Sequence, residues 1–387
     1  MPSSCAAFTF LPHDFWRLSP KPAWRTSGLS WTGSRGILVS VERIFVRGTN
    51  WVGDAVMSIP ALRELRRARP DAHIALAVRP WVRAIYDHAD YVDEIIPYDR
   101  QNSDGGLHWL AWIERLRLRR FDSALLLQNA FEAALMTRLA AIPRRIGYAG
   151  DSRGRLLTDA LVRRTTRPRH QIYDYLDLLT LSGLSPRDYA TGDFHPDLSI
   201  RLPGRIVARA RQRLADSGIL PGQTVVAISP GAFFGAAKRW FPERYAELGN
   251  RLAGEGARIV LVGSSGEVSL AETIAAAMKP SPLVLTGRTT LEELMAVLAS
   301  CDLLVTNDSG PMHLGCALGI PLLALFGSTD DEATGPYSPR ARWIHKHVEC
   351  SPCLLRECPI DLRCFDRIHV DEVFAECMAI LNAGVRG

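Results

Sequence analysis

The fold of this chain is decided by the stretch Val305-Thr306-Asn307-Asp308-Ser309-Gly310-Pro311-Met312-His313-Leu314. An apolar run that ends at Val305 predicts a buried strand, and residues 312–318 predict a helix. Asp308, Ser309 and Gly310 therefore stand where a strand ends and a helix begins, which is where open α/β sheets bind ligands. The free N–H groups and positive end of that helix favour an anion such as a diphosphate. Ordinary capping of the helix is the alternative, because Asp and Ser are good caps anywhere.

Strand and helix patterns alternate along most of the chain. In the first half, strands are expected at 44–46, 74–78, 94–96, 123–127 and 145–148, and helices at 53–69, 107–119, 132–141 and 172–182. In the second half, strands are expected at 225–228, 258–262, 283–285, 303–305 and 322–325, and helices at 242–253, 268–278, 291–299, from 312, and at 370–381. This alternation predicts parallel sheets with both faces covered. The expected fold is α/β, with two Rossmann-like domains facing each other across a cleft.

The chain has 387 residues, enough for two domains. Residues 191–204 are the expected linker, since prolines and glycines gather there. Residues 42–190 would form the N-terminal domain and 205–387 the C-terminal one. Residues 1–41 are expected to be an extension, of which 1–36 are rich in Ser, Pro, Trp and Arg; they are interpreted either as disordered or as the product of a start codon assigned too early.

Composition excludes several classes of protein. Hydrophobic residues make up 47% of the chain, so a large core is expected. No apolar run approaches the roughly 18 residues that span a bilayer, and no secretory signal is recognisable, so a cytoplasmic location is expected. The net charge is +5, but residues 111–170 contain thirteen arginines and only five acidic residues. Such a region suggests an anionic partner, such as a phosphate-bearing lipid or nucleic acid, or else a solvated basic face.

Four of the eight cysteines lie close together: Cys350, Cys353, Cys358 and Cys364. Their spacing, C-x2-C-x4-C-x5-C, suggests a metal or iron–sulfur site, although it is not a standard zinc spacing. A disulfide framework is disfavoured without an export signal. A non-catalytic metal-binding protein centred on these cysteines is therefore one alternative function.

The first loop of the N-terminal half reads Arg47-Gly48-Thr49-Asn50-Trp51-Val52-Gly53-Asp54. Asp54 opens the helix after the first strand, where it is either a partner of the helix dipole or a general base. The loop is not G-x-G-x-x-G, and the chain has no G-x-x-x-x-G-K-[ST] motif. A nicotinamide dinucleotide and a Walker-type NTPase are therefore poorly supported.

The corresponding loop of the second half runs from Ser229 through Gly231 to Lys238 and Arg239. Small residues followed by fixed cations predict a phosphate cradle, although a single Lys is often merely solvated. Glu267 follows the next strand and is either a ribose ligand or a first-turn acid. His313 lies one turn into the helix after Asp308, where it either reaches the ligand or serves as a satisfied cap histidine.

From about Val41 onward, the chain resembles the ADP-heptose:lipopolysaccharide heptosyltransferases, GT-B enzymes of glycosyltransferase family 9. The resemblance is carried by Arg47…Gly53-Asp54…Pro60-Ala61-Leu62, by Pro230-Gly231…Lys238-Arg239-Trp240 and by residues 306–313. The segment Cys350-Ser351-Pro352-Cys353…Cys358 is more similar to the second-heptose branch. Thr49-Asn50 departs from many members of that branch, which leaves the acceptor open.

The resemblance implies inverting transfer of a heptose from ADP-L-glycero-D-manno-heptose to the anionic inner core of lipopolysaccharide, lipid A with Kdo. It assigns Asp54 as the base and Lys238 to the diphosphate and sugar. The other implied donor ligands are Ser229, Gly231, Glu267, Asp308, Ser309, Gly310 and His313, with Arg239 in the cradle. Peripheral association with the inner membrane is expected. No metal, no other cofactor and no nucleic acid partner is expected. Alternatives are a sugar-nucleotide epimerase and a family member with another sugar or acceptor.

Overall fold

A computed structural model describes residues 41–99, 106–164, 169–189 and 194–384. By its internal contacts the chain divides into Met1–Val41 and Glu42–Gly387. The expected extension at residues 1–36 lies outside the described residues.

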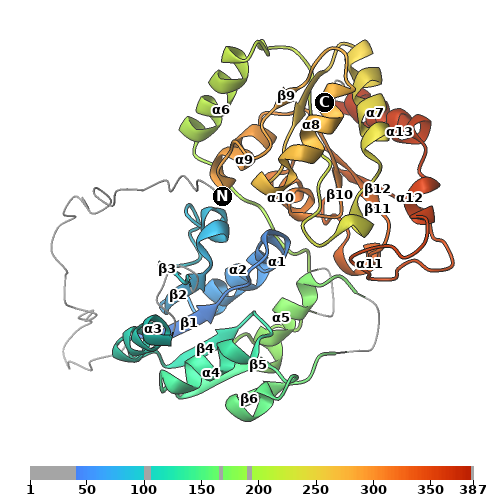
Figure 1. The fold of residues 1–387 in the computed structure, drawn as a ribbon. Helices are drawn as coiled ribbons and strands as arrows, with labels where there is room; N and C mark the ends of the chain where they lie inside the picture. The colour runs from blue at the N-terminus through green and yellow to red at the C-terminus, as the bar shows by residue number, and fades with distance from the viewer. Residues whose placement is uncertain (1–40, 100–105, 165–168, 190–193, 385–387) are drawn as a thin grey trace, which may run out of the picture. The chain divides into compact units, whose positions relative to one another are not determined.

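The first sheet has six parallel strands in the order β3-β2-β1-β4-β5-β6 (Figure 1). Its strands are β1 (Arg43–Arg47), β2 (His73–Val78), β3 (Glu94–Pro97), β4 (Ser123–Leu126), β5 (Arg144–Tyr148) and β6 (Asp159–Leu161). The helical segments of this half are α1 (Val52–Met57), α2 (Ile59–Ala68), η1 (Pro80–Ile85), α3 (Gly106–Leu118), α4 (Phe131–Leu139), η2 (Arg153–Leu156) and α5 (Ile172–Leu181).

The second sheet repeats this topology, because its order β9-β8-β7-β10-β11-β12 is again 3-2-1-4-5-6. Its strands are β7 (Val225–Ser229), β8 (Arg258–Leu261), β9 (Leu283–Val284), β10 (Leu303–Asn307), β11 (Leu322–Phe326) and β12 (Ala341–His345). The helical segments are α6 (Gly204–Asp216), η3 (Ala236–Lys238), α7 (Pro242–Gly254), η4 (Ser265–Glu267), α8 (Val268–Ala276), α9 (Leu291–Leu298), α10 (Gly310–Leu318), α11 (Asp331–Thr334), α12 (Arg363–Asp366) and α13 (Val370–Gly384).

The central strands have the apolar composition that a doubly covered parallel sheet requires. All five residues of β7, β10 and β11 are buried. Such strands are continuous hydrophobic runs because helices cover both faces of the sheet. The two sheets predicted from the sequence are therefore present, and the proposed boundaries at 42–190, 191–204 and 205–387 remain a prediction.

Both sheets have a topological switch point. In the first sheet β1 lies between β2 and β4, and in the second β7 lies between β8 and β10. Neighbouring connections leave in opposite directions at such a point, so a crevice opens beyond the carboxyl ends of the strands. The loops after β1, β7 and β10 carry most of the predicted site residues.

Local structure differs from expectation at several places, since strands β6 and β12 and the short helices α11 and α12 were not predicted. The helix expected at 53–69 is two helices, α1 and α2, which meet at Ser58. Pro60 is at the start of α2, where its missing N–H costs little, so the chain restarts a helix there. Helix α10 begins at Gly310, two residues earlier than expected. Helix α6 was not predicted, and its first residue, Gly204, belongs to the expected linker.

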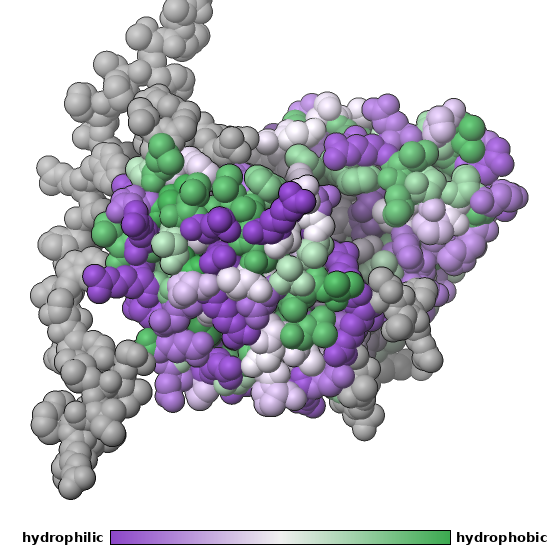
Figure 2. Space-filling model, turned by 90° about the horizontal axis from the view of Figure 1, so that it is seen from below, coloured by the Kyte–Doolittle hydropathy of each residue, from purple (hydrophilic) through white to green (hydrophobic). Residues whose placement is uncertain are grey.

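The described surface mixes polar and apolar side chains. Figure 2 shows hydrophobic and hydrophilic residues intermingled over the visible face. Among the described residues, no helix combines the length and apolar character needed to cross a bilayer.

Candidate active site

Asp54 lies in the first turn of α1, after the loop that follows β1. Its Oδ1 accepts hydrogen bonds from Gln171 Nε2 at 2.7 Å and from the Tyr175 hydroxyl at 3.1 Å. Burial raises the pKa of Asp54 above its ordinary value, and the two hydrogen bonds and the charge of Lys238 partly oppose that rise. A desolvated carboxylate with a raised pKa is suited to accept a proton near neutral pH.

Lys238 ends the short 3-10 helix η3, beyond β7. Its Nζ lies 2.5 Å from Asp308 Oδ2 and 3.4 Å from the Asp308 carbonyl oxygen. The same Oδ2 accepts a hydrogen bond of 2.7 Å from Thr329 Oγ1. Both members of the ion pair are well buried, with side-chain exposures of 15% and 5%. Asp308 therefore fixes the position of the ammonium group, a function that the sequence analysis did not separate from ligand contact.

The loop between β7 and η3 is held by side chains around it. Arg239 donates two hydrogen bonds to the carbonyl of Ala232, at 3.1 and 3.3 Å. Asn307, at the end of β10, donates to the carbonyls of Pro230 and Gly231 at 2.7 and 3.3 Å. Its Oδ1 accepts from the Trp240 amide and the Tyr245 hydroxyl. In this structure Arg239 contacts the loop backbone, and hydrogen bonds from Arg239 and Asn307 hold the loop in place.

Gly231 and Glu267 lie against each other. A Cβ on Gly231 would stand 1.8 Å from Glu267 Oε1, so any larger residue would displace the carboxylate. The other oxygen, Oε2, accepts from the amide and the hydroxyl of Ser264, at 2.7 and 2.8 Å, in a capping box. Glu267 is thus the first-turn acid of one interpretation, and its Oε1 lies beside Gly231 in the loop between β7 and η3. Ser229 is buried at the end of β7.

The start of α10 meets the start of α1. Ser309 caps α10, and its hydroxyl lies 3.2 Å from Thr306 Oγ1. A Cβ on Gly310 would be 3.0 Å from Val52 Cβ, and one on Gly53 would be 2.7 Å from His313 Cδ2. These two glycines therefore let the helices touch. His313 is buried with its Nδ1 unpartnered, and burial lowers its pKa to about 4, so it is a neutral imidazole.

Most predicted site residues therefore lie near the ends of three strands, β1, β7 and β10. Lys238 and Asp308 both act on the charge of Asp54, which places the carboxylate and the ammonium group in one electrostatic neighbourhood. Gln171, Tyr175, Asn307 and Thr329 were missed by sequence analysis. Asn307 stands next to the quoted Asp308 and was visible as a polar residue ending a buried strand; the other three carry no local signal.

Many arginines of the basic region, residues 111–170, form ion pairs with carboxylates inside or outside that region. Among the residues that the structure describes, seven of these arginines lie within 4.0 Å of a carboxylate: Arg117, Arg119, Arg144, Arg153, Arg163, Arg164 and Arg169. Ion pairs of this kind reduce the field that the region presents to a partner. The composition of the region thus overstates its free positive charge.

The four clustered cysteines line one small cavity of about 20 Å³. Their thiols are free, and Cys358 Sγ accepts a hydrogen bond from the Leu362 amide at 3.4 Å. No three of their sulfur atoms all lie within 4.8 Å of one another; among the described residues, the one group of three or more potential ligands that does so is Asp331, His345 and His347.

Comparison with known proteins identifies the family. The family described as glycosyltransferase family 9 (heptosyltransferase) matches residues 109–363. Lipopolysaccharide heptosyltransferase 2 of Salmonella typhimurium is 34% identical over 316 residues, which cover 78% of this chain and 87% of that protein. The Escherichia coli K12 protein of the same name is 32% identical over 311 residues, with coverages of 78% and 87%.

The fold leads to the same family. The solved structure of Escherichia coli ADP-heptose lipopolysaccharide heptosyltransferase II superposes with a TM-score of 0.75 at 29% identity, covering 88% of this chain and 99% of that one. The two parallel six-stranded sheets are thus those of a GT-B fold. The chain belongs to glycosyltransferase family 9, the heptosyltransferases, and is a glycosyltransferase.

Proposed function

We propose that the chain is an inverting heptosyltransferase that moves a heptose from ADP-L-glycero-D-manno-heptose to the inner core of lipopolysaccharide, as the second heptose. One observation carries the chemistry: a buried carboxylate, Asp54, lies within the electrostatic reach of a fixed cation, Lys238. The identity of 34% to a lipopolysaccharide heptosyltransferase 2 supports the choice of sugar and acceptor.

Asp54 is the proposed general base. As the acceptor hydroxyl oxygen bonds to the anomeric carbon of the heptose, its proton passes to the Asp54 carboxylate. The bond between that carbon and the diphosphate breaks on the opposite face, so the configuration inverts and ADP departs. Among the residues that the structure describes, none donates a hydrogen bond to Asp54 Oδ2, whereas Oδ1 accepts hydrogen bonds from Gln171 and Tyr175. The two neutral donors thus orient the carboxylate while leaving an oxygen to receive the proton.

Lys238 and the first N–H groups of α10 are proposed to bind the diphosphate. Negative charge builds on the leaving group as the glycosidic bond breaks, and a preorganised ammonium group stabilises it. The diphosphate would compete with Asp308 for Lys238, and Thr329 keeps Asp308 in place during that exchange. Glu267 Oε1, beside Gly231, is the proposed acceptor of a ribose hydroxyl. Ser229, Ser309, Gly310 and His313 complete the proposed donor pocket.

The acceptor is proposed to be the anionic, lipid A- and Kdo-bearing inner core, with the enzyme peripheral on the cytoplasmic face of the inner membrane. Flotation with liposomes of phosphatidylglycerol and phosphatidylcholine across a salt series tests the membrane part. Binding that falls as salt rises is expected, because screening weakens contacts between exposed charges. Binding that ignores salt would contradict the electrostatic attachment.

The reaction is tested by incubating the purified chain with ADP-heptose and a lipopolysaccharide that carries a single core heptose. Mass spectrometry should show the acceptor gaining one heptose unit, while an acceptor without any heptose should gain none. A sample with donor alone separates this function from epimerisation, because an epimerase changes the sugar without an acceptor. Conversion of donor alone, with no acceptor product, would refute the transfer reaction.

A further inference from the structure

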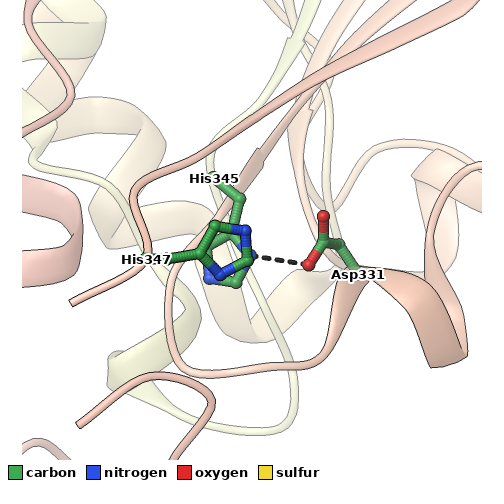
Figure 3. Close-up of side chains that lie close together, drawn as sticks. All are labelled: Asp331, His345 and His347. Atoms are coloured by element: carbon green, nitrogen blue, oxygen red, sulfur yellow. Dashed lines mark hydrogen bonds and ion pairs between the residues drawn. The ribbon is translucent and has the colours of Figure 1, made fainter. Parts of the chain in front are cut away.

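Three potential metal ligands converge at the edge of the second sheet, outside the proposed active site. Asp331 opens α11, His345 ends β12, and His347 follows two residues later. Their ligand atoms all lie within 4.8 Å of one another, and Figure 3 shows the two imidazoles close together, with the carboxylate of Asp331 beside His345. Asp331 Oδ1 lies 2.7 Å from His345 Nδ1, and the imidazole rings are 4.1 Å apart between centroids.

The atoms that do not face the centre of this group are held by other side chains. Trp343 Nε1 donates to Asp331 Oδ2 at 2.8 Å, and His345 Nε2 bonds Ser351 Oγ at 2.9 Å. Ser351 in turn donates to the carbonyl of Gly327 at 2.6 Å. Proteins orient ligating carboxylates and imidazoles by this kind of outer hydrogen bond. Asp331 Oδ1 and His345 Nδ1 are hydrogen-bonded to each other, and an ion held by these two atoms and a nitrogen of His347 would take the place of that hydrogen bond.

We propose that Asp331, His345 and His347 form a binding site for one divalent first-row transition metal ion of the zinc type, which fixes the loop between β11 and α11. Two imidazoles and one carboxylate suit such an ion better than Mg²⁺ or Ca²⁺, which prefer oxygen ligands. His345 and Asp331 are almost enclosed, with side-chain exposures of 2% and 13%, whereas His347 is exposed. An ion can therefore enter from the side of His347.

The loop that this ion would fix and the helix α11 that follows it together touch both halves of the proposed active site. Thr329 donates to Asp308, the carboxylate that holds Lys238. The carbonyl of Ala333 accepts a hydrogen bond of 2.8 Å from the backbone amide of Gln171, and the Gln171 side chain donates a hydrogen bond to Asp54. A metal bound at Asp331 stands between these two attachments along the chain. We expect the ion to keep Asp54 and Lys238 correctly placed relative to each other, and we do not expect it to take part in the transfer.

The cavity lined by the four cysteines is the competing location for an ion. It adjoins the histidine group through Ser351, which lines the cavity and bonds His345. Thiolates and imidazoles give different signals with Co²⁺, because sulfur ligands add intense charge-transfer absorption. Co²⁺ can therefore report which group holds the metal.

The experiment uses the full chain, purified without a polyhistidine tag, stripped with a chelator and dialysed. Titration with Co²⁺, followed by visible absorption, and with Zn²⁺, followed by calorimetry, should each give one ion per chain. His347→Ala should weaken Zn²⁺ binding at least about tenfold, since even outer-shell losses cost about 10–100-fold. Asp331→Asn, which keeps the shape of the side chain, should weaken it similarly. His195→Ala removes another exposed histidine and should change nothing.

Two outcomes would overturn the site. One is the absence of stoichiometric binding in a chain whose circular dichroism shows it folded. The other is thiolate charge-transfer absorption that persists in His347→Ala and disappears in Cys353→Ser/Cys358→Ser, which would put the ion at the cysteines. Hydrogen exchange of residues 329–335 should slow when Zn²⁺ binds, and unchanged exchange would overturn the coupling. None of these measurements depends on the proposed transfer reaction.

Discussion

The loops after β1 and β7 occupy the same place in two sheets of the same topology, yet the side chains proposed to act there are held differently. The carboxylate of Asp54 is held by two neutral donors, Gln171 and Tyr175. The ammonium group of Lys238 is held by a charged partner, Asp308. Burial therefore raises the pKa of Asp54 without a bonded cation to cancel the effect.

This contrast fits two different chemical tasks. A base must take up a proton, so a salt bridge that stabilised its charged form would lower its basicity. A cation that receives a diphosphate need only be in place, and an ion pair orients it until the ligand arrives. A base held by neutral donors and a cation held by an ion pair therefore each suit their proposed task.

The largest effect is expected for Asp54→Asn. The amide keeps the size of the side chain and an oxygen for Gln171 and Tyr175, but it cannot take the acceptor proton. Turnover should fall by roughly a hundredfold or more, as for loss of a general base, while calorimetry should find nearly unchanged affinity for ADP-heptose. Asp54→Ala should give the same result. Turnover equal to that of the parent protein would remove Asp54 from the base function.

Lys238→Ala should lower the affinity for ADP by about 10–100-fold, the range expected for loss of a hydrogen bond to a charged group. Asp308 would then be left buried without its cation, so circular dichroism must establish that the variant is folded. Lys279→Ala, at an exposed lysine, is the matched control. Calorimetry with ADP measures the change, and an affinity like that of the control would contradict the phosphate cradle.

Tyr175→Phe should change the pH profile more than the maximal rate. The Tyr175 hydroxyl donates to Asp54 and lowers the pKa of that carboxyl, so its loss should raise the pKa further. Because the base is active when deprotonated, the acidic limb of kcat/KM should move to higher pH. Tyr189→Phe, whose hydroxyl bonds Ser185 instead, should leave the limb in place. A profile that coincides with the parent's would show that Tyr175 does not tune the base.

The fold was largely predictable because local patterns encode it. Continuous apolar runs such as 303–305 and 322–325 predicted buried parallel strands, and both proved to lie in the second sheet. The break at Ser58 was missed because Pro60 is equally acceptable in the first turn of one long helix or at the start of a second. Gly310 begins α10 because Ser309 is extended, a backbone state that the sequence does not display.

Candidate site residues could be predicted from the sequence only where they lie in a loop between an expected strand and an expected helix. Asp54, Lys238 and Asp308 were proposed as site residues in this way. Gln171 and Tyr175 lie 117 and 121 residues from Asp54, and no local pattern links them to it. His345 and His347 alternate at a strand end and do leave a signal, but their partner Asp331 comes from another element. Partners that meet only through the topology require the structure.

The smallest expected effect is on thermal stability. It distinguishes a carboxylate held by neutral donors from one held by an ion pair. The pKa of Asp54 in the folded chain is raised, mainly by burial, so this group stabilises the fold only when protonated. That contribution is complete below the unfolded-state pKa and is lost as pH rises through the folded one. Asp54→Asn should therefore raise the thermal midpoint at pH 7 by about 1–4 °C, and the gain should shrink as pH falls towards about 4.

Asp159→Asn is the control of opposite sign. Burial alone would raise the pKa of Asp159, but hydrogen bonds from Arg144 and Thr158 outweigh it and lower the pKa. Its stabilisation is therefore present above the unfolded-state pKa and is lost as pH falls through the folded one, so this variant should melt earlier at pH 7. Differential scanning fluorimetry across pH 4–8 compares the two. If both substitutions destabilised the chain at pH 7, the carboxylate of Asp54 would be held as favourably as an ion-paired one, and the contrast between the two loops would fail.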